Sequence, residues 1–307
     1  MRLAVFFHPG DDEFAKKVLK AIIDIGISAN AYRIHPWWKD DAAERLISVL
    51  NASTHILLII PRTVGQHTDE LSWLYFLAGF CSAKAKYVYY LADSSSLTVP
   101  SFFSGIERIP SIQYLKNAIL RGRDDWISEQ NMKKARDVLE KLNIPVSNVG
   151  FVECVKQENI QALKQFIILG FSPDSCDKNG IPALSHAVRV RSLDVVDFLL
   201  SHGADVNKIA PDRNNTPLMD AAGDGNLEIV NRLLQESPNL DIQSKNGQTA
   251  LILAIGQGAL DVANRLIDAG ADIRLVDALG MTALKYAELF RYPDLVDKLK
   301  EKMADNG

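Results

Sequence analysis

The sequence has 307 residues, which is enough for two domains of ordinary size. Hydrophobic residues make up 47% of the chain and charged residues 23%, the composition of a folded protein rather than a disordered one. The formal net charge is −4, and residues 146–307 carry 16 Lys and Arg against 22 Asp and Glu. This acidic balance argues against a nucleic-acid-binding groove in the C-terminal half.

No segment indicates export or membrane insertion. The first ten residues lack the basic and apolar regions of a signal peptide, and the apolar run at residues 56–60 is far shorter than the roughly 20 residues of a membrane helix. Cys81, Cys154 and Cys176 are odd in number and have no metal-ligand spacing, so we expect reduced thiols. These features predict a cytoplasmic protein with no membrane segment.

The N-terminal half alternates short apolar runs with segments of helical periodicity. We expect strands at residues 2–7, 27–32, 55–60 and 87–91, a weaker strand at 109–114, and helices at 11–25, 42–50 and 68–81. Alternating strands and helices predict an α/β domain, in which a parallel sheet is covered by helices on both faces. Ligands of such a sheet bind in the crevice at the carboxyl ends of its strands.

Two stretches of this half resemble the Toll/interleukin-1 receptor (TIR) family. Residues 8–32, HPGDDEFAKKVLKAIIDIGISANAY, look like the opening of a TIR domain, with the family's S-x-x-D-x-x-F-a-x-x-L pattern before a second strand. Residues 43–80 are similar to the family's next helix, its strand ending in proline and its tryptophan-bearing helix. The resemblance covers about residues 1–120 and implies a flavodoxin/TIR-like three-layer fold. A receiver domain is the main alternative, but its phosphorylatable Asp is missing where the third strand ends at Ile60-Pro61.

The resemblance also bears on catalysis, because catalytic TIR domains cleave NAD with a glutamate four residues after the helix tryptophan. Alignment on Trp73 places Leu77 at that position, and leucine can neither stabilise charge nor accept a proton. Glu70 lies two helical turns earlier and is the remaining candidate, although the helix dipole also favours an acid in a first turn. We therefore expect no catalytic residue, no cofactor and no metal in this domain.

Trp37 and Trp38 follow the second expected strand, in the loop that TIR domains use for self-association. Tryptophan is enriched at interface hot spots, so the pair favours a homotypic contact. A lid folded over the local core is the alternative interpretation.

A connecting helix is expected at residues 123–145, because residues 123–143 carry one apolar stripe that includes Trp126 and Leu139 and ends before Pro145. It separates a domain of residues 1–122 from a region of residues 146–307. We expect the helix to pack on one or both of them.

The C-terminal region repeats itself. The apolar residues Phe151, Leu184, Leu218, Leu251 and Leu284 recur at spacings of 33, 34, 33 and 33, and three further apolar columns keep the same register. The units run from about 146–176, 177–209, 210–243, 244–276 and 277–307. Each unit has the apolar stripes of two short helices followed by a hairpin-like loop.

These units resemble the ankyrin family, whose repeat contains T-P-L-H and G-A-D-V-N. The matches include Thr216-Pro217-Leu218 and Gly203-Ala204-Asp205-Val206-Asn207. The resemblance implies an all-α solenoid of about five repeats. The motif histidine is replaced, by Ser185, Met219, Ile252 and Lys285, so we expect its turn hydrogen bond to be lost.

The ankyrin resemblance implies binding of a protein partner on the concave face, which the loop tips and the first helices line. The candidate partner-binding residues are Lys208, Asp212, Asn214, Met219, Asp220, Asp224, Ser244, Lys245, Asn246, Lys285 and Tyr286. The sequence thus favours an adaptor, with a TIR-like signalling domain and ankyrin repeats that each bind protein. The alternative is a TIR-type enzyme that processes NAD or another nucleotide and that the repeats target or regulate.

Overall fold

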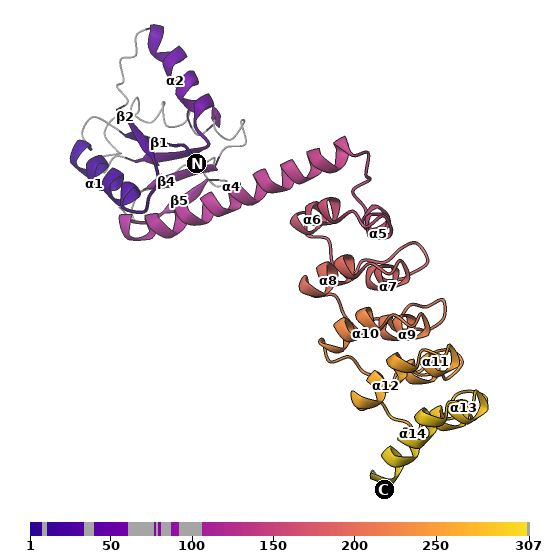
Figure 1. The fold of residues 1–307 in the computed structure, drawn as a ribbon. Coiled ribbons are helices and arrows are strands. Elements are labelled where there is room, and N and C mark those ends of the chain that lie inside the picture. The colour runs from indigo at the N-terminus through magenta and orange to yellow at the C-terminus, as the bar shows by residue number, and fades with distance from the viewer. Residues whose placement is uncertain are drawn as a thin grey trace. The chain divides into compact units, whose positions relative to one another are not determined.

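The computed structural model describes residues 1–7, 11–33, 40–60, 77, 79–80, 87–91 and 106–305. The chain divides into two compact units, Met1–Glu129 and Gln130–Gly307 (Figure 1). The helix expected at residues 68–81 lies mostly outside the described residues, and the loop that carries Trp37 and Trp38 lies wholly outside them.

The first unit is built on a parallel sheet, as predicted. Within the described part of this unit the strands are β1 (Leu3–Phe7), β2 (Ala29–Arg33), β3 (His55–Ile59), β4 (Tyr87–Leu91) and β5 (Glu107–Ile109). They pair in the order β2-β1-β3-β4-β5, and every neighbouring pair is parallel. The connections include helices α1 (Asp12–Ile23) and α2 (Asp40–Ala52).

Alternate residues of the strands enter two separate cores on opposite faces of the sheet. On one face, Val5 and Leu57 pack with Val18 of α1 and with helix α4 (Ile112–Lys141). On the other face, strand residues pack with α2 and with Leu77. This burial on both faces explains why β1, β3 and β4 are apolar almost throughout, whereas the edge strands β2 and β5 are polar and more exposed.

Helix α4 lies very close to the sheet. His55 is fully buried, and its Nε2 lies 3.1 Å from the carbonyl oxygen of Gly122. A Cβ atom added at Gly122 would lie 1.5 Å from the Tyr89 hydroxyl, so a larger residue at this crossing would displace the Tyr89 side chain. Burial also lowers the pKa of His55.

Two expected elements differ from the structure. The weak strand expected at residues 109–114 is instead β5 (Glu107–Ile109), because Pro110 has no amide hydrogen for the ladder, and α4 already begins at Ile112. Helix α4 is therefore much longer than the helix expected at residues 123–143. It spans the boundary of the two units: Ile119 belongs to the core beneath the sheet and Leu139 to the core of the repeats.

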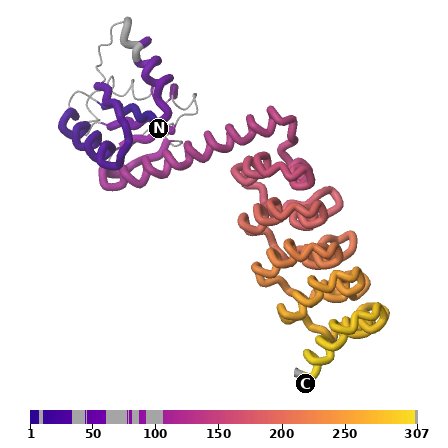
Figure 2. Tube along the Cα trace, in the orientation of Figure 1, coloured from indigo at the N-terminus to yellow at the C-terminus, as the bar shows by residue number. Residues whose placement is uncertain are grey.

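The second unit stacks helix pairs, one pair for each sequence repeat (Figures 1 and 2). The pairs are α5 (Asn148–Lys156) with α6 (Ile160–Ile168), α7 (Ala183–Arg189) with α8 (Leu193–Ser201), α9 (Pro217–Gly223) with α10 (Leu227–Leu234), α11 (Ala250–Gly256) with α12 (Leu260–Asp268), and α13 (Ala283–Leu289) with α14 (Pro293–Asp305). All of them contribute to one continuous apolar core.

Threonine caps begin the first helices of the last three repeats. The side chain of Thr216 accepts a hydrogen bond from the amide of Met219, and Thr249 and Thr282 cap their helices in the same way. At Met219, which stands in place of the motif histidine, the sulfur lies 3.5 Å from the amide nitrogen of Thr216 and acts as a weak acceptor for it.

A hydrogen-bond ladder joins the outer corners of the repeats. The amide of Asp205 donates to Asp174, and the amide of Asp272 donates to Asp241. The intervening corner lacks the usual glycine, yet Ser237 adopts the same left-handed conformation, with φ 53°, and the amide of Asn239 keeps the ladder bond.

We predict that Leu218→Ala lowers the free energy of unfolding by about 2–5 kcal/mol, the usual cost of truncating a core leucine. Leu218 is 1% exposed at the start of α9 and packs within the continuous core. Urea unfolding followed by circular dichroism measures the loss. Leu279→Ala is the control, since Leu279 is 81% exposed and its truncation should change stability by less than about 0.5 kcal/mol. Equal effects of the two substitutions would contradict the repeat register.

Candidate functional site

The candidate site lies along the hairpin loops and first helices of repeats two to five. The loops are joined from repeat to repeat, because the amide of Lys245 donates to the Arg213 carbonyl oxygen and the amide of Ala278 donates to that of Asn246. Asn214 holds its turn in the left-handed conformation, with φ 61°. The loops thus form a continuous edge beside the first helices.

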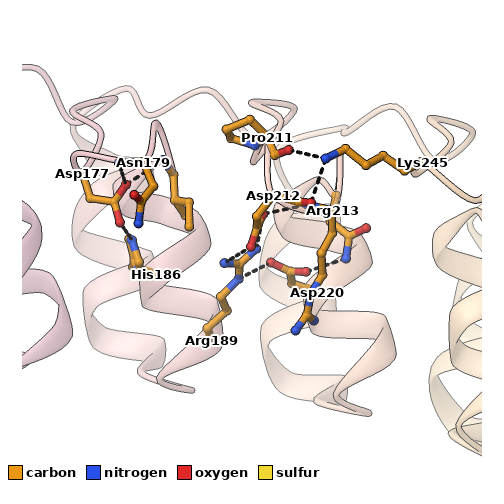
Figure 3. Close-up of polar contacts among 11 residues, drawn as sticks. Asp177, Asn179, His186, Arg189, Pro211, Asp212, Arg213, Asp220 and Lys245 are labelled. Atoms are coloured by element: carbon orange, nitrogen blue, oxygen red, sulfur yellow. Dashed lines mark hydrogen bonds and ion pairs between the residues drawn. The ribbon is translucent and has the colours of Figure 1, made fainter.

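Carboxylates inside two of the loops tie each loop to its own helix. Oδ1 of Asp177 accepts from the amide of Ile181 at 2.9 Å, while its Oδ2 lies 3.0 Å from Nε2 of His186 (Figure 3). Asp277 repeats the arrangement and accepts from the Tyr286 hydroxyl at 2.6 Å. Burial acts to raise the pKa of Asp277, but the bonds from Tyr286 and from two backbone amides outweigh burial and lower it.

Arg189 connects the second repeat to the third. Its guanidinium donates through Nε to Asp220 at 2.7 Å, and through Nη1 and Nη2 to Asp212 at 2.9 and 3.2 Å (Figure 3). The side chain of Asp220 is 5% exposed and also accepts from Asn215 at 2.7 Å. The hydrogen bonds from Arg189 hold the pKa of Asp212 below its usual range.

A second pair lies further along the same surface. Arg191 donates to Asp224 through Nε at 2.6 Å and through Nη2 at 2.9 Å. This two-point contact lowers the pKa of Asp224. Because Arg191 is largely exposed, the pair contributes less to stability than the pair of Arg189 and Asp220.

The predicted lysine and serine contacts are also engaged within the stack. Nζ of Lys245 donates to the carbonyl oxygens of Pro211 and Asp212, at 2.8 and 2.9 Å. Nζ of Lys208 donates to the Asp174 carbonyl oxygen at 3.0 Å, and Ser244 accepts from a backbone amide of its own loop. These side chains bind neighbouring repeats or their own loop.

Lys285 is more exposed than the equivalent residues of the other repeats. The equivalent residues of the preceding repeats, Met219 and Ile252, are each 1% exposed, whereas Lys285 is exposed. Glu288 is likewise exposed where Ile255 is fully buried. The outer face of the fifth repeat is therefore polar, as terminal repeats require for solubility.

A cleft of about 230 Å³ opens among the first helices of repeats two, three and four. It is lined by Arg189, Arg213, Asn215, Met219, Asp220, Gly223, Asp224, Leu253 and Gln257. The structure thus brings Asp220 and Asp224 of the predicted set together. Met219 lies on the floor of the cleft, where its buried side chain serves mainly as core.

Sequence reasoning missed the arginines that bind the aspartates of this cleft. Arg189 and Arg191 lie at the end of α7, and their partners are 23 to 33 residues away in the next repeat. The sequence pattern that could have indicated these contacts is one of charge alone, because two arginines of the second repeat are followed by three aspartates in the third. Arg213 is exposed, and its side chain forms no hydrogen bond or ion pair among the described residues.

The candidates of the N-terminal unit are only partly placed. Glu70, Trp37 and Trp38 lie outside the described residues. Leu77 is 1% exposed and packs with Leu50, Ile56 and Leu58 on one face of the sheet. Within the described ranges no cluster of three or more metal-binding side chains is found, and no helix there is long and apolar enough to cross a membrane.

We predict that Asp212→Asn destabilises the protein at neutral pH by weakening the bonds from Arg189. The lowered pKa of Asp212 contributes stability that is fully present above its unfolded value, about 4, and is lost as the pH falls through the folded value. The difference between wild type and Asp212→Asn should therefore shrink in acid.

Urea unfolding at a series of pH values from 7 to about 2 checks this. Asp297→Asn is the matched control, because this exposed carboxylate forms no bond among the described residues. A difference for Asp212→Asn that stays constant with pH would contradict the prediction.

Comparison with known proteins agrees with this geometry. A family profile described as "Ankyrin repeats (3 copies)" matches residues 151–244 and 218–307. A putative ankyrin repeat-containing protein of Treponema pallidum is 25% identical over 251 residues, which cover 81% of this chain and 83% of that protein. The aligned part of this chain is longer than the repeats alone.

Two larger proteins match over a smaller share of their length. Glycerophosphocholine phosphodiesterase gde1 of Schizosaccharomyces pombe is 28% identical over 64% of this chain and 17% of that protein. Human palmitoyltransferase ZDHHC13 is 30% identical over 34% of this chain and 17% of that protein. The family profile covers half of this chain, in the region of the stacked helix pairs. The chain therefore belongs to the ankyrin-repeat family.

Proposed function

We propose that this chain is an adaptor that holds a protein partner on the inner face of its repeats. The cleft beside Asp220 and Asp224 carries the proposal, because it is the place where side chains of three successive repeats meet one open surface. Ankyrin repeats generally bind protein partners, and a stack of repeats suits an extended segment. The proposed contact residues are those of the predicted set that remain exposed beside this cleft.

Most polar side chains of the predicted set have a structural role as well. Asp212, Asp220 and Asp224 fix the arginines, and Lys245 fixes the next loop. Such paired groups form a rigid, prearranged surface, which lowers the entropy lost on binding. Binding is therefore better tested by adding a bulky side chain to the inner face than by removing these groups.

We further propose that the N-terminal unit is a TIR-like signalling domain. The strand order β2-β1-β3-β4-β5 supports this, since it is the order of flavodoxin-like sheets. The similarity to the Treponema pallidum protein extends over 81% of the chain and so supports a shared N-terminal part. Homotypic contact through Trp37 and Trp38 stays part of this proposal.

A non-catalytic role for this domain is favoured by the position of Leu77. Its side chain is buried in an apolar core, and a fixed carboxylate is what stabilises the positive charge that develops when the nicotinamide bond breaks. We propose that the domain does not hydrolyse NAD.

Gly256→Trp tests the adaptor function. Gly256 is the last residue of α11, at the position equivalent to Gly223 of the cleft, and a Cβ atom added there would have no atom within 4 Å. We expect the substitution to leave the fold intact and to abolish partner capture by the full chain from extracts of the source cells. Glu228→Trp, on the exposed side of α10, is the control and should capture the same partners. Partners retained by Gly256→Trp would contradict binding on the inner face.

Incubation of wild type and Glu70→Ala with NAD, with nicotinamide measured by chromatography, tests the second proposal. We expect no release above buffer from either protein. Turnover by wild type that disappears in Glu70→Ala would make the domain an enzyme. Leu77→Glu is not a useful variant, because it would place a charge in the core.

A further inference from the structure

The inner face of the stack changes in chemistry from the third repeat to the fifth. The cleft positions of the third repeat are Arg213, Asp220, Gly223 and Asp224. The equivalent positions of the fifth repeat, two repeats further along the chain, hold Leu279, Tyr286, Leu289 and Phe290. A charged surface thus gives way to an apolar one, and we name these last four residues the distal apolar patch.

The distal apolar patch is open to solvent. Leu279 is 81% exposed, Leu289 62% and Phe290 42%. The rings of Tyr286 and Phe290 stack with their centroids 6.0 Å apart, so the aromatic part of the patch is ordered. Exposed apolar residues that cluster on one face usually mark a binding site.

The exposed charges beside this surface that lack a charged partner are cationic. The Asp277 carboxylate beneath Tyr286 is buried, and it accepts hydrogen bonds from the Tyr286 hydroxyl and two backbone amides. Asp212, Asp220 and Asp224 are bound to arginines. Arg213 and Arg291, which follows Phe290 in the chain, form no side-chain bond among the described residues. A carboxylate of a partner therefore finds free guanidinium groups, whereas a partner's cation finds carboxylates that are already neutralised.

The repeat spacing fixes the distance between the two features. Packed helices lie about 8–10 Å apart, so two repeats separate Arg213 from the distal apolar patch by roughly 20 Å. An extended chain rises about 3.3 Å per residue, and this distance then corresponds to about six residues.

We propose that the repeats bind an extended, acidic segment of a partner protein. A carboxylate of this segment pairs with Arg213, and an aromatic or large aliphatic side chain about six residues away packs on the distal apolar patch. The inference rests on the proposed function and names the chemistry of the partner that the inner face accepts.

Fluorescence anisotropy with designed peptides tests the inference on the full chain. The probes are 14-residue Gly/Ser peptides that carry a Glu pair and a Phe-Leu pair, with the separation varied from two to ten residues. We expect affinity to peak near six residues and to fall at least tenfold when Lys replaces Glu. Arg213→Glu and Leu289→Ser should each weaken the best peptide by about tenfold.

Matched controls guard against general effects of charge or polarity. Arg136→Glu changes the charge on the exposed part of α4, and Ile23→Ser removes a side chain that is 61% exposed in the first unit. Both should bind like wild type. Affinity that is independent of the separation, equal binding of Lys peptides, or no binding of any acidic peptide would overturn the inference. So would a dimer in light scattering that Leu289→Ser converts to monomers, because a second copy would then occupy the patch.

The two proposals fail differently. Partner capture that is lost in Gly256→Trp, together with peptides that do not bind, would leave the adaptor function standing and remove only the acidic segment. Capture that survives Gly256→Trp would remove the adaptor function itself.

Discussion

The apolar contact between neighbouring repeats is the constraint on which the repeat region depends. No helix pair of about 15 to 20 residues encloses a core by itself, and in this chain residues such as Leu184, Leu218 and Leu251 become buried only between two neighbours. The threonine caps, the left-handed turns and the corner ladder follow from this requirement, because they place each pair in the same register as the last. The polar side chains are then left to the loop edge.

At that edge, one set of residues has two uses. Arg189 joins α7 to the next loop, and the same guanidinium forms a wall of the cleft. The aspartates that suggested partner contacts in the sequence are paired with Arg189 and Arg191, and the predicted lysines Lys208 and Lys245 donate to backbone carbonyl oxygens. The surface offered to a partner is therefore defined by the side chains that remain unpaired. What is left over is a cation at Arg213 and apolar surface at the fifth repeat.

Much of this arrangement could be predicted from the sequence, for physical reasons. The core columns are periodic, so the repeat register could be read directly, and β3 and β4 are apolar runs whose bounds were nearly correct. Contacts across repeats could not be read in that way. Arg189 meets Asp212 because the loop of one unit lies over the helix end of another, and no local pattern encodes this. Met219 was expected to contact a partner because the first helices line the concave face, yet its side chain is 1% exposed and belongs to the core.

Helix α4 sets the direction in which the repeat stack unfolds. Ile119 is held by the sheet and Leu139 by the first repeat, and both lie on one helix without a break. A repeat stack by itself can melt from either end, because its end repeats each lack a neighbour. Here the first repeat packs against Leu139 of α4, so it does not lack a neighbour. Unfolding under heat or force should therefore start at the fifth repeat and proceed toward the second. The fifth repeat is then the part of the stack that a partner can most readily remodel.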